Sequence, residues 1–160
     1  MKTAVYPGTF DPITLGHLDI VERASKLFDK IVVSVSTNPQ KNPMFSLEER
    51  IHMVQLSTKA FSNVEVHSFE GLLVNYAEKT RAVAVIRGLR AVSDFEYEFQ
   101  MALMNRKLNC KLETVFLMPS EKYTYINSTI VKEVGRLGGD VSHFLSEEVL
   151  FELNKKLNLL

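Results

Sequence analysis

The sequence predicts an α/β fold in which a five-stranded parallel sheet is covered by helices on both faces. Three observations support it: five short β-rich runs recur along the chain, helical patterns fill the gaps, and residues 82–86 are all apolar. Strands that alternate with helices must be joined by crossovers, and right-handed crossovers build a parallel sheet. A continuous apolar run is typical of a strand buried on both faces.

The elements can be placed in order along the chain. The five strands are expected at residues 3–6, 31–36, 64–69, 82–87 and 114–118. The first helix follows the first strand, because apolar residues recur there at i, i+4, i+7 and i+8, namely Ile20, Ala24, Leu27 and Phe28. The second helix begins at a capping box formed by Ser46 and Glu49. Four more helices are expected at residues 72–79, 93–107, 128–137 and 146–157.

Length and composition favour one domain, residues 1–160. A chain of 160 residues is near the roughly 150 expected of a single domain. The chain is 46% hydrophobic and 24% charged, which is typical of globular proteins and excludes disorder. Nineteen Lys and Arg balance nineteen Asp and Glu. Neither a nucleic acid nor a membrane is therefore expected as a partner, and any anion must be bound by a local cluster.

Cysteine content and the absence of long apolar runs indicate in which cellular compartment the protein is expected. The single cysteine, Cys110, cannot form an internal disulfide. No apolar run reaches the roughly 18 residues that span a bilayer. Residues 1–3 lead directly into the first strand, without an apolar signal region. These features favour a cytoplasmic protein.

The candidate site lies at one edge of the predicted sheet. Ligands of an open parallel sheet bind beyond the carboxyl ends of its strands. The segments expected there are rich in groups that hold phosphate, and they are residues 6–17, 37–41, 87–90 and 119–129. We therefore expect the site to bind phosphate groups.

The first of these segments carries Thr14-Leu15-Gly16-His17 at the start of a helix. The glycine lets a ligand approach the backbone, and the helix N-terminus favours an anion. His17 can add a donor to that anion. The other three histidines are interpreted as solvated or structural residues, and they are His52, His67 and His143.

Basic residues follow two other strands. Lys41 lies in the loop after the second strand and is a candidate to bind phosphate. The alternative is that it is an exposed lysine without a function. Arg87 and Arg90 flank Gly88 directly after an apolar strand, so their guanidinium groups need partners. Phosphate oxygens suit them. The structural alternative is a salt bridge to one of the acidic residues that follow, Asp94, Glu96 or Glu98.

A second candidate anion site precedes the fifth helix at Asn127-Ser128-Thr129, where Ser128 is expected to be the N-cap. Neither a Walker A sequence nor a G-x-G-x-x-G motif is present, which argues against P-loop hydrolysis and ordinary dinucleotide binding. Metal-ligand and nucleophile signatures are also missing. The site is thus expected to hold phosphates without covalent catalysis.

These motifs resemble a known family. Thr14-Leu15-Gly16-His17 resembles the T/H-x-G-H motif of the nucleotidyltransferase superfamily, and Asn127-Ser128-Thr129-Ile130 resembles its second motif. The combination of residues 86–91 with residues 94–98 is specific to bacterial phosphopantetheine adenylyltransferases. Together with residues 6–14, 43–45, 47–50, 116–120 and 131–134, the resemblance covers nearly the whole chain. It implies a Rossmann-like fold of the nucleotidyltransferase type.

The resemblance also implies an activity. Members of this family transfer the adenylyl group of ATP to 4′-phosphopantetheine, which gives dephospho-coenzyme A and pyrophosphate in the penultimate step of coenzyme A synthesis. The family is typically a cytoplasmic homohexamer that uses Mg²⁺ and is inhibited by coenzyme A. Two departures concern contacts with ATP, because Asn127 stands where many relatives have serine and Tyr123 where tryptophan is common.

Site residues follow from the same resemblance. Carried over by position, the contacts with phosphopantetheine are Thr9, Lys41, Leu73 and Arg87. The contacts with ATP are Thr9, Phe10, His17, Gly88, Leu89, Arg90, Glu98, Tyr123, Thr124, Tyr125, Ile126, Asn127, Ser128 and Thr129. His17 is expected to stabilise the transition state, aided by Lys41 and Arg90.

The residues themselves favour in-line attack of one phosphate on the α-phosphorus of ATP, without a covalent intermediate or a general base. Two alternatives remain open. One is a related nucleotidyltransferase that acts on nicotinamide mononucleotide or glycerol phosphate. The other is a flavodoxin-like binding or signalling module, although Asp11 alone does not form the acidic cluster of a phospho-receiver.

Exposed aromatic and Met side chains on the fourth helix are separately expected at a subunit interface, namely Phe95, Tyr97, Phe99 and Met101.

Overall fold

The computed structural model describes residues 1–37, 42–90 and 92–159, without the side chains of residues 92–94. Its centre is a five-stranded sheet with the strand order β3-β2-β1-β4-β5, in which every pair of neighbours is parallel. The strands are β1 (Thr3–Gly8), β2 (Lys30–Ser36), β3 (Val64–Phe69), β4 (Ala84–Gly88) and β5 (Glu113–Leu117). The predicted parallel sheet is confirmed, with strand ends shifted by one or two residues.

Within the described residues, six α-helices accompany the strands. They are α1 (Leu15–Ser25), α2 (Leu47–Thr58), α3 (Leu73–Lys79), α4 (Val92–Leu108), α5 (Ser128–Arg136) and α6 (Glu147–Lys156). The predicted capping box of α2 is present, because Ser46 Oγ accepts from Glu49 N and the Glu49 carboxylate accepts from Ser46 N. The predicted N-cap of α5 is wrong by one residue. Asn127 Oδ1 accepts from Ile130 N at 2.8 Å, which leaves Ser128 Oγ to bind elsewhere.

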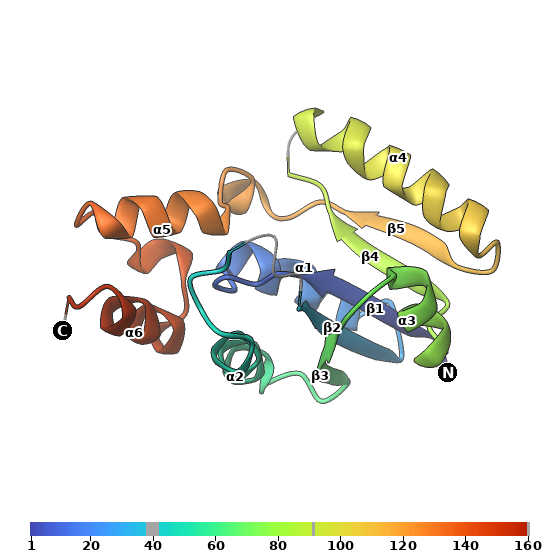
Figure 1. The fold of residues 1–160 in the computed structure, drawn as a ribbon, viewed down its shortest axis with the longest axis horizontal. Helices are drawn as coiled ribbons and strands as arrows, with labels where there is room; N and C mark the ends of the chain where they lie inside the picture. The colour runs from blue at the N-terminus through green and yellow to red at the C-terminus, as the bar shows by residue number, and fades with distance from the viewer. Residues whose placement is uncertain (38–41, 91, 160) are drawn as a thin grey trace.

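Helices cover both faces of the sheet, as the sequence predicted (Figure 1). Helices α1 and α2 pack on one face and enclose the larger core, to which alternate residues of β1, β2 and β4 contribute. Helices α3 and α4 lie on the other face, where Val74 and Ala77 of α3 pack against Val85 of β4 in a smaller core. Valines and isoleucines of β1, β2 and β4 are fully buried, since central parallel strands have two covered faces.

The last two helices lie beyond the carboxyl ends of the strands, away from the N-terminus (Figure 1). Helix α6 packs on α2 and α5, and ion pairs join Lys59 to Glu148 and Lys156 to Glu49. This arrangement places the N-terminus of α5 beside the loop that follows β1, where Ser128 Oγ donates to Pro12 O at 2.7 Å. In the part of the chain that the structure describes, no helix combines the length and the apolar character that crossing a membrane requires.

Candidate active site

A cavity of about 550 Å³ opens at the carboxyl edge of the sheet. Its walls come from the ends of β1 and β4, the first turns of α1 and α5, and part of α4. The chain leaves β1 and β4 in opposite directions across the sheet, and ligands of open parallel sheets bind at such a switch point. The volume is that of a typical small-molecule site.

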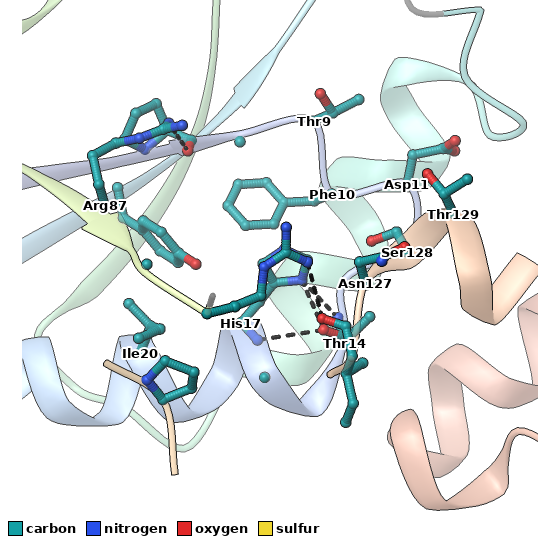
Figure 2. Close-up of a pocket in the computed structure, with 18 of the residues that line it drawn as sticks. Thr9, Phe10, Asp11, Thr14, His17, Ile20, Arg87, Asn127, Ser128 and Thr129 are labelled. Atoms are coloured by element: carbon teal, nitrogen blue, oxygen red, sulfur yellow. Dashed lines mark hydrogen bonds between the residues drawn. The ribbon is translucent and has the colours of Figure 1, made fainter. Parts of the chain in front are cut away.

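His17 is held at the first turn of α1 by Thr14. Thr14 is the N-cap, and its backbone N–H donates to His17 Nδ1 at 3.0 Å, while Thr14 Oγ lies 3.0 Å from the same nitrogen and accepts from His17 N (Figure 2). A nitrogen that accepts a backbone N–H carries no proton of its own. The hydrogen of the neutral ring is therefore on Nε2, which makes Nε2–H a donor.

The surroundings of His17 keep it neutral. Its ring meets that of Phe10 edge-on with centroids 5.2 Å apart, and both side chains turn toward the same cavity (Figure 2). Burial, together with the positive charge of Arg90, lowers the pKa of His17 from 6.5 to about 4. At neutral pH the site thus presents an uncharged donor next to charged guanidinium groups.

This shift of the His17 pKa predicts a pH-dependent stability. Below pH 6.5 the unfolded chain binds a proton at His17 that the folded chain binds only near pH 4. The free energy of unfolding should therefore decrease as the pH falls from about 6.5 towards about 4, and this part of the decrease should be absent from His17→Gln. Urea unfolding at several pH values would measure it. Parallel pH profiles for the two proteins would contradict the assignment.

Phe10 has a backbone φ of 48°, in the left-handed region that side chains rarely adopt. Its buried ring is held edge-on between Tyr6 and His17. The ring lies over Gly8, where an added Cβ would be 2.7 Å from Phe10 Cζ. Gly8 thus leaves the space into which the Phe10 ring packs, and Phe10 in turn supports His17.

Replacing Gly8 by alanine should therefore displace the Phe10 ring and, with it, His17. We expect kcat to fall by about 10-fold or more, because small misplacements of catalytic groups have large effects. We also expect a loss of about 1–3 kcal/mol in the free energy of unfolding from overpacking. Steady-state kinetics and urea unfolding would check both values. A variant that matches the original protein in kcat and stability would show that the ring can move freely.

Arg87 at the end of β4 forms a two-point ion pair with Glu98 of α4. Its Nε donates to Glu98 Oε2 at 2.7 Å, its Nη2 donates to Glu98 Oε1, and its Nη1 donates to Pro7 O at 3.4 Å. Although burial opposes the charge, the Glu98 carboxylate raises the pKa of Arg87 above its ordinary value. The salt bridge that the sequence left open as an alternative is therefore present for Arg87, inside the cavity that both residues line.

Arg90 reaches across the cavity, because its Nη1 donates to Ile126 O at 3.0 Å in the segment before α5. That segment is also fixed from the other side, where the Asp19 carboxylate of α1 accepts from Ser120 N at 2.9 Å and Ser120 Oγ at 2.5 Å. Arg90 and Asp19 thus hold the chain that leads into α5. The first turn of α5 brings Asn127, Ser128 and Thr129 to the cavity (Figure 2).

A buried polar network ties these segments together. The Asp11 carboxylate, 5% exposed, accepts from Met44 N at 3.0 Å and Phe45 N at 2.9 Å and forms an ion pair with Lys132 of α5. Arg50 of α2, also buried, donates to three carbonyl oxygens, those of Thr9, Ser36 and Phe45. The ends of β1 and β2 and the start of α5 are thereby joined around the site.

A second cavity of about 250 Å³ adjoins the first on the α3 and α4 side of the sheet. The two share Thr9, Arg87 and Glu98 among their lining residues. The residues that line the second cavity but not the first include Phe69, Leu73, Met101 and Asn105. A ligand could therefore place an anionic end at Arg87 and extend a less polar chain into the second cavity.

Most of the predicted site residues line the first cavity: Thr9, Phe10, His17, Arg87, Gly88, Arg90, Glu98, Ile126, Asn127, Ser128 and Thr129. Leu73 lines the second cavity, whereas Leu89, Tyr123, Thr124 and Tyr125 line neither. Lys41 lies outside the described residues. Tyr6 and Lys132 also line the first cavity, although the sequence interpretation included them only in the segments 6–17 and 131–134 and not as individual site residues. Lys132 could have been found, because it lies one helical turn after Ser128.

The described residues of the cavity do not form a resident metal site. Among the described residues, no group of three or more His, Cys, Asp or Glu could hold a metal ion. The carboxylates that line the cavity already have partners, since Asp11 binds Lys132 and two backbone N–H groups and Glu98 binds Arg87. A Mg²⁺ ion here would therefore need ligand oxygens from phosphate groups and water, as is common for this ion.

Comparison with known proteins places the chain among nucleotide-transferring enzymes. Residues 5–134 match the family described as cytidylyltransferase-like. A phosphopantetheine adenylyltransferase of Alkaliphilus metalliredigens is 55% identical over 156 residues, which cover 98% of this chain and 99% of that protein. Proteins of the same name from Caldanaerobacter subterraneus and Clostridium botulinum are 54% and 51% identical, over 98% and 99% of this chain and 98% and 96% of their own lengths.

Solved structures agree on the fold. A crystal structure of a provisionally assigned nicotinate-nucleotide adenylyltransferase from Vibrio parahaemolyticus superposes with a TM-score of 0.74, at 22% identity, and covers 96% of this chain and 99% of that one. A lipopolysaccharide core biosynthesis protein from Thermoplasma volcanium has a TM-score of 0.54 at 20% identity, over 75% of this chain and 97% of its own. At such identities the likeness concerns the fold alone.

Proposed function

The chain belongs to the phosphopantetheine adenylyltransferase family, and on that premise we propose that it transfers the adenylyl group of ATP to 4′-phosphopantetheine. The products are dephospho-coenzyme A and pyrophosphate. The observation that carries the assignment is full-length identity above 50% to relatives of this one name. The sister reactions on nicotinamide mononucleotide or glycerol phosphate, and a binding module without chemistry, are correspondingly disfavoured.

The geometry is suited to in-line transfer. The phosphate of phosphopantetheine attacks the α-phosphorus of ATP, the bond to the β-phosphate oxygen breaks, and pyrophosphate leaves. The attacking phosphate is already anionic near neutral pH, so no general base is needed. His17 Nε2–H can donate to the oxygens of the reacting phosphoryl group, where negative charge is redistributed. Arg90 and the N-terminus of α5 supply further positive potential from the nucleotide side.

The acceptor is proposed to bind from the other side. Arg87 lies where the two cavities join, so its guanidinium can receive the phosphate of phosphopantetheine. The second cavity can then take the pantetheine chain, with Leu73 and Met101 facing its methylene groups and Asn105 available to its amides. Lys41 and Thr9 complete the proposed acceptor contacts. Glu98 must share or release Arg87 when this phosphate binds.

Mg²⁺, the oligomer, regulation and compartment are proposed from the family resemblance. Mg²⁺ would enter with the triphosphate and neutralise its charge, since the described carboxylates of the cavity are already paired. A homohexamer is supported by the exposed large side chains on α4, which include Phe95, Tyr97, Phe99 and Met101. Feedback inhibition by coenzyme A and a cytoplasmic location complete the proposal.

Pyrophosphate release tests the function directly. The purified protein should release pyrophosphate from ATP and 4′-phosphopantetheine in the presence of Mg²⁺. Parallel reactions would contain CTP in place of ATP, or nicotinamide mononucleotide or glycerol phosphate in place of phosphopantetheine. Release with only the first pair would support both substrates. Release with another pair would move the chain to a sister activity, and no release from any pair would contradict the proposal.

A further inference from the structure

We propose that the hydroxyl group of Tyr6 is a hydrogen-bond donor to an oxygen atom of the bound nucleotide. This assignment rests on the proposed function, because it names a contact within the ATP half of that site. Tyr6 belongs to the motif at residues 6–14 that resembles the family, but it is not among the site residues carried over from the family. Its side chain lies on β1 and lines the first cavity.

The position of the Tyr6 ring is fixed by the core. The residue is 5% exposed, and its ring meets that of Phe10 edge-on with centroids 5.5 Å apart. The larger core cluster surrounds it on the α1 side of the sheet. The hydroxyl cannot swing out to bulk water without moving this packed ring. Any partner must therefore come to the hydroxyl inside the cavity.

No protein partner occupies that hydroxyl within the ranges 1–37, 42–90 and 92–159: none of the hydrogen bonds there involves the Tyr6 side chain. Tyr76 behaves differently, since its hydroxyl lies 3.2 Å from Ser34 Oγ and 3.3 Å from His67 Nδ1. Ser57 Oγ is the fully buried side-chain polar atom without a partner in the described ranges, and Tyr6 Oη is not of that kind, so the Tyr6 hydroxyl opens onto the cavity. A hydroxyl that opens onto the cavity and has no described protein partner is available to donate to a ligand there.

The surroundings identify the nucleotide as that ligand. Tyr6 lines the first cavity and not the second, which excludes the proposed site for the pantetheine chain. Its hydroxyl lies against the end of β4, where a Cβ on Gly88 would be 3.9 Å from Tyr6 Oη and 3.4 Å from Ile20 Cγ1. Figure 2 shows Ile20 and His17 on the same wall of the cavity. This is the part of the site proposed for ATP.

The chemistry of the hydroxyl fits a donor. Burial raises the pKa of the Tyr6 phenol, even though Arg87 and Arg90 act in the opposite direction. The group therefore keeps its proton throughout the range in which the enzyme works. A neutral O–H beside two guanidinium groups suits an oxygen that carries negative charge or lone pairs, such as a phosphate or ribose oxygen.

Tyr6→Phe tests the contact, because it removes one oxygen atom and keeps the ring. We expect the KM for ATP to rise by about 5-fold to 10-fold, as for loss of one hydrogen bond to a ligand. The KM for phosphopantetheine should stay within about twofold, and the Tm should not fall, since no described protein group loses a partner. The matched control is Tyr76→Phe, which should lower the Tm without changing the KM for ATP.

An unchanged KM for ATP in Tyr6→Phe, with unchanged kcat, would overturn the contact and show that the hydroxyl binds only water. A rise confined to the KM for phosphopantetheine would overturn it as well. These results differ from a failure of the proposed function, in which the original protein itself would release no pyrophosphate. Calorimetric titration with ATP alone would add a check that does not depend on turnover, and it should show the same loss of affinity.

Discussion

Replacing His17 by alanine should lower kcat by about 10² or more, with modest changes in both KM values, because one preorganised donor to a developing charge typically has this effect. The donor is Nε2–H, since Nδ1 already accepts the backbone N–H of Thr14. With the pKa of His17 lowered to about 4, the ring stays neutral and its function should not change between pH 6 and 8. Steady-state kinetics across this range measures both effects.

His17→Gln provides a sharper comparison than alanine alone, because its amide N–H can partly replace Nε2–H. We expect it to recover part of the lost kcat. The matched control is His52→Ala on α2, an exposed histidine that does not line either cavity. It should leave kcat unchanged. A near-normal kcat in His17→Ala would refute the role of His17 in the transition state.

Asp11→Ala should lower the free energy of unfolding by about 3–5 kcal/mol, the usual effect of leaving one member of a buried ion pair alone. It would leave Lys132, whose side chain is also largely buried, without its ion-pair partner. It would also remove the acceptor of the backbone N–H groups of Met44 and Phe45. Activity should fall too, because Asp11 joins the loop after β1 to the first turns of α5. Urea unfolding and the pyrophosphate assay would measure the two consequences.

Three further variants, namely Lys156→Met, Lys132→Met and the double variant, separate loss of the buried ion pair from a general loss of charge. Lys156→Met breaks the more exposed pair with Glu49 and should lower the free energy of unfolding by at most about 1 kcal/mol. The double variant Asp11→Ala with Lys132→Met should be less destabilised than the sum of the single effects, since it leaves no buried charge unpaired. Strict additivity of the two single variants would contradict the pairing.

The α/β class, the parallel direction of the strands and the edge that carries the candidate site were all predictable from local pattern. β-Branched runs alternate with amphipathic helices, and this alternation restricts the connections to crossovers. The edge follows from the same rule, so the residues after β1 and β4 could be nominated before any contact was known. Local capping patterns correctly predicted Ser46 as the N-cap of α2. For α5 they predicted Ser128, whereas Asn127 is the N-cap.

Other features of the site depend on contacts between residues far apart in the chain, and only the tertiary structure shows them. Arg87 was expected to bind phosphate or an acidic neighbour, and only the position of α4, which packs on β5, shows that Glu98 holds it from inside the cavity. Asp11 meets Lys132 across 121 positions of sequence, so no local pattern reports the pair. The tautomer of His17, the absence of a partner for the Tyr6 hydroxyl among the described residues and the second cavity likewise arise from packing in three dimensions. Periodicity determines which face of an element is buried, whereas the partner that each polar group finds there is determined by how the elements pack.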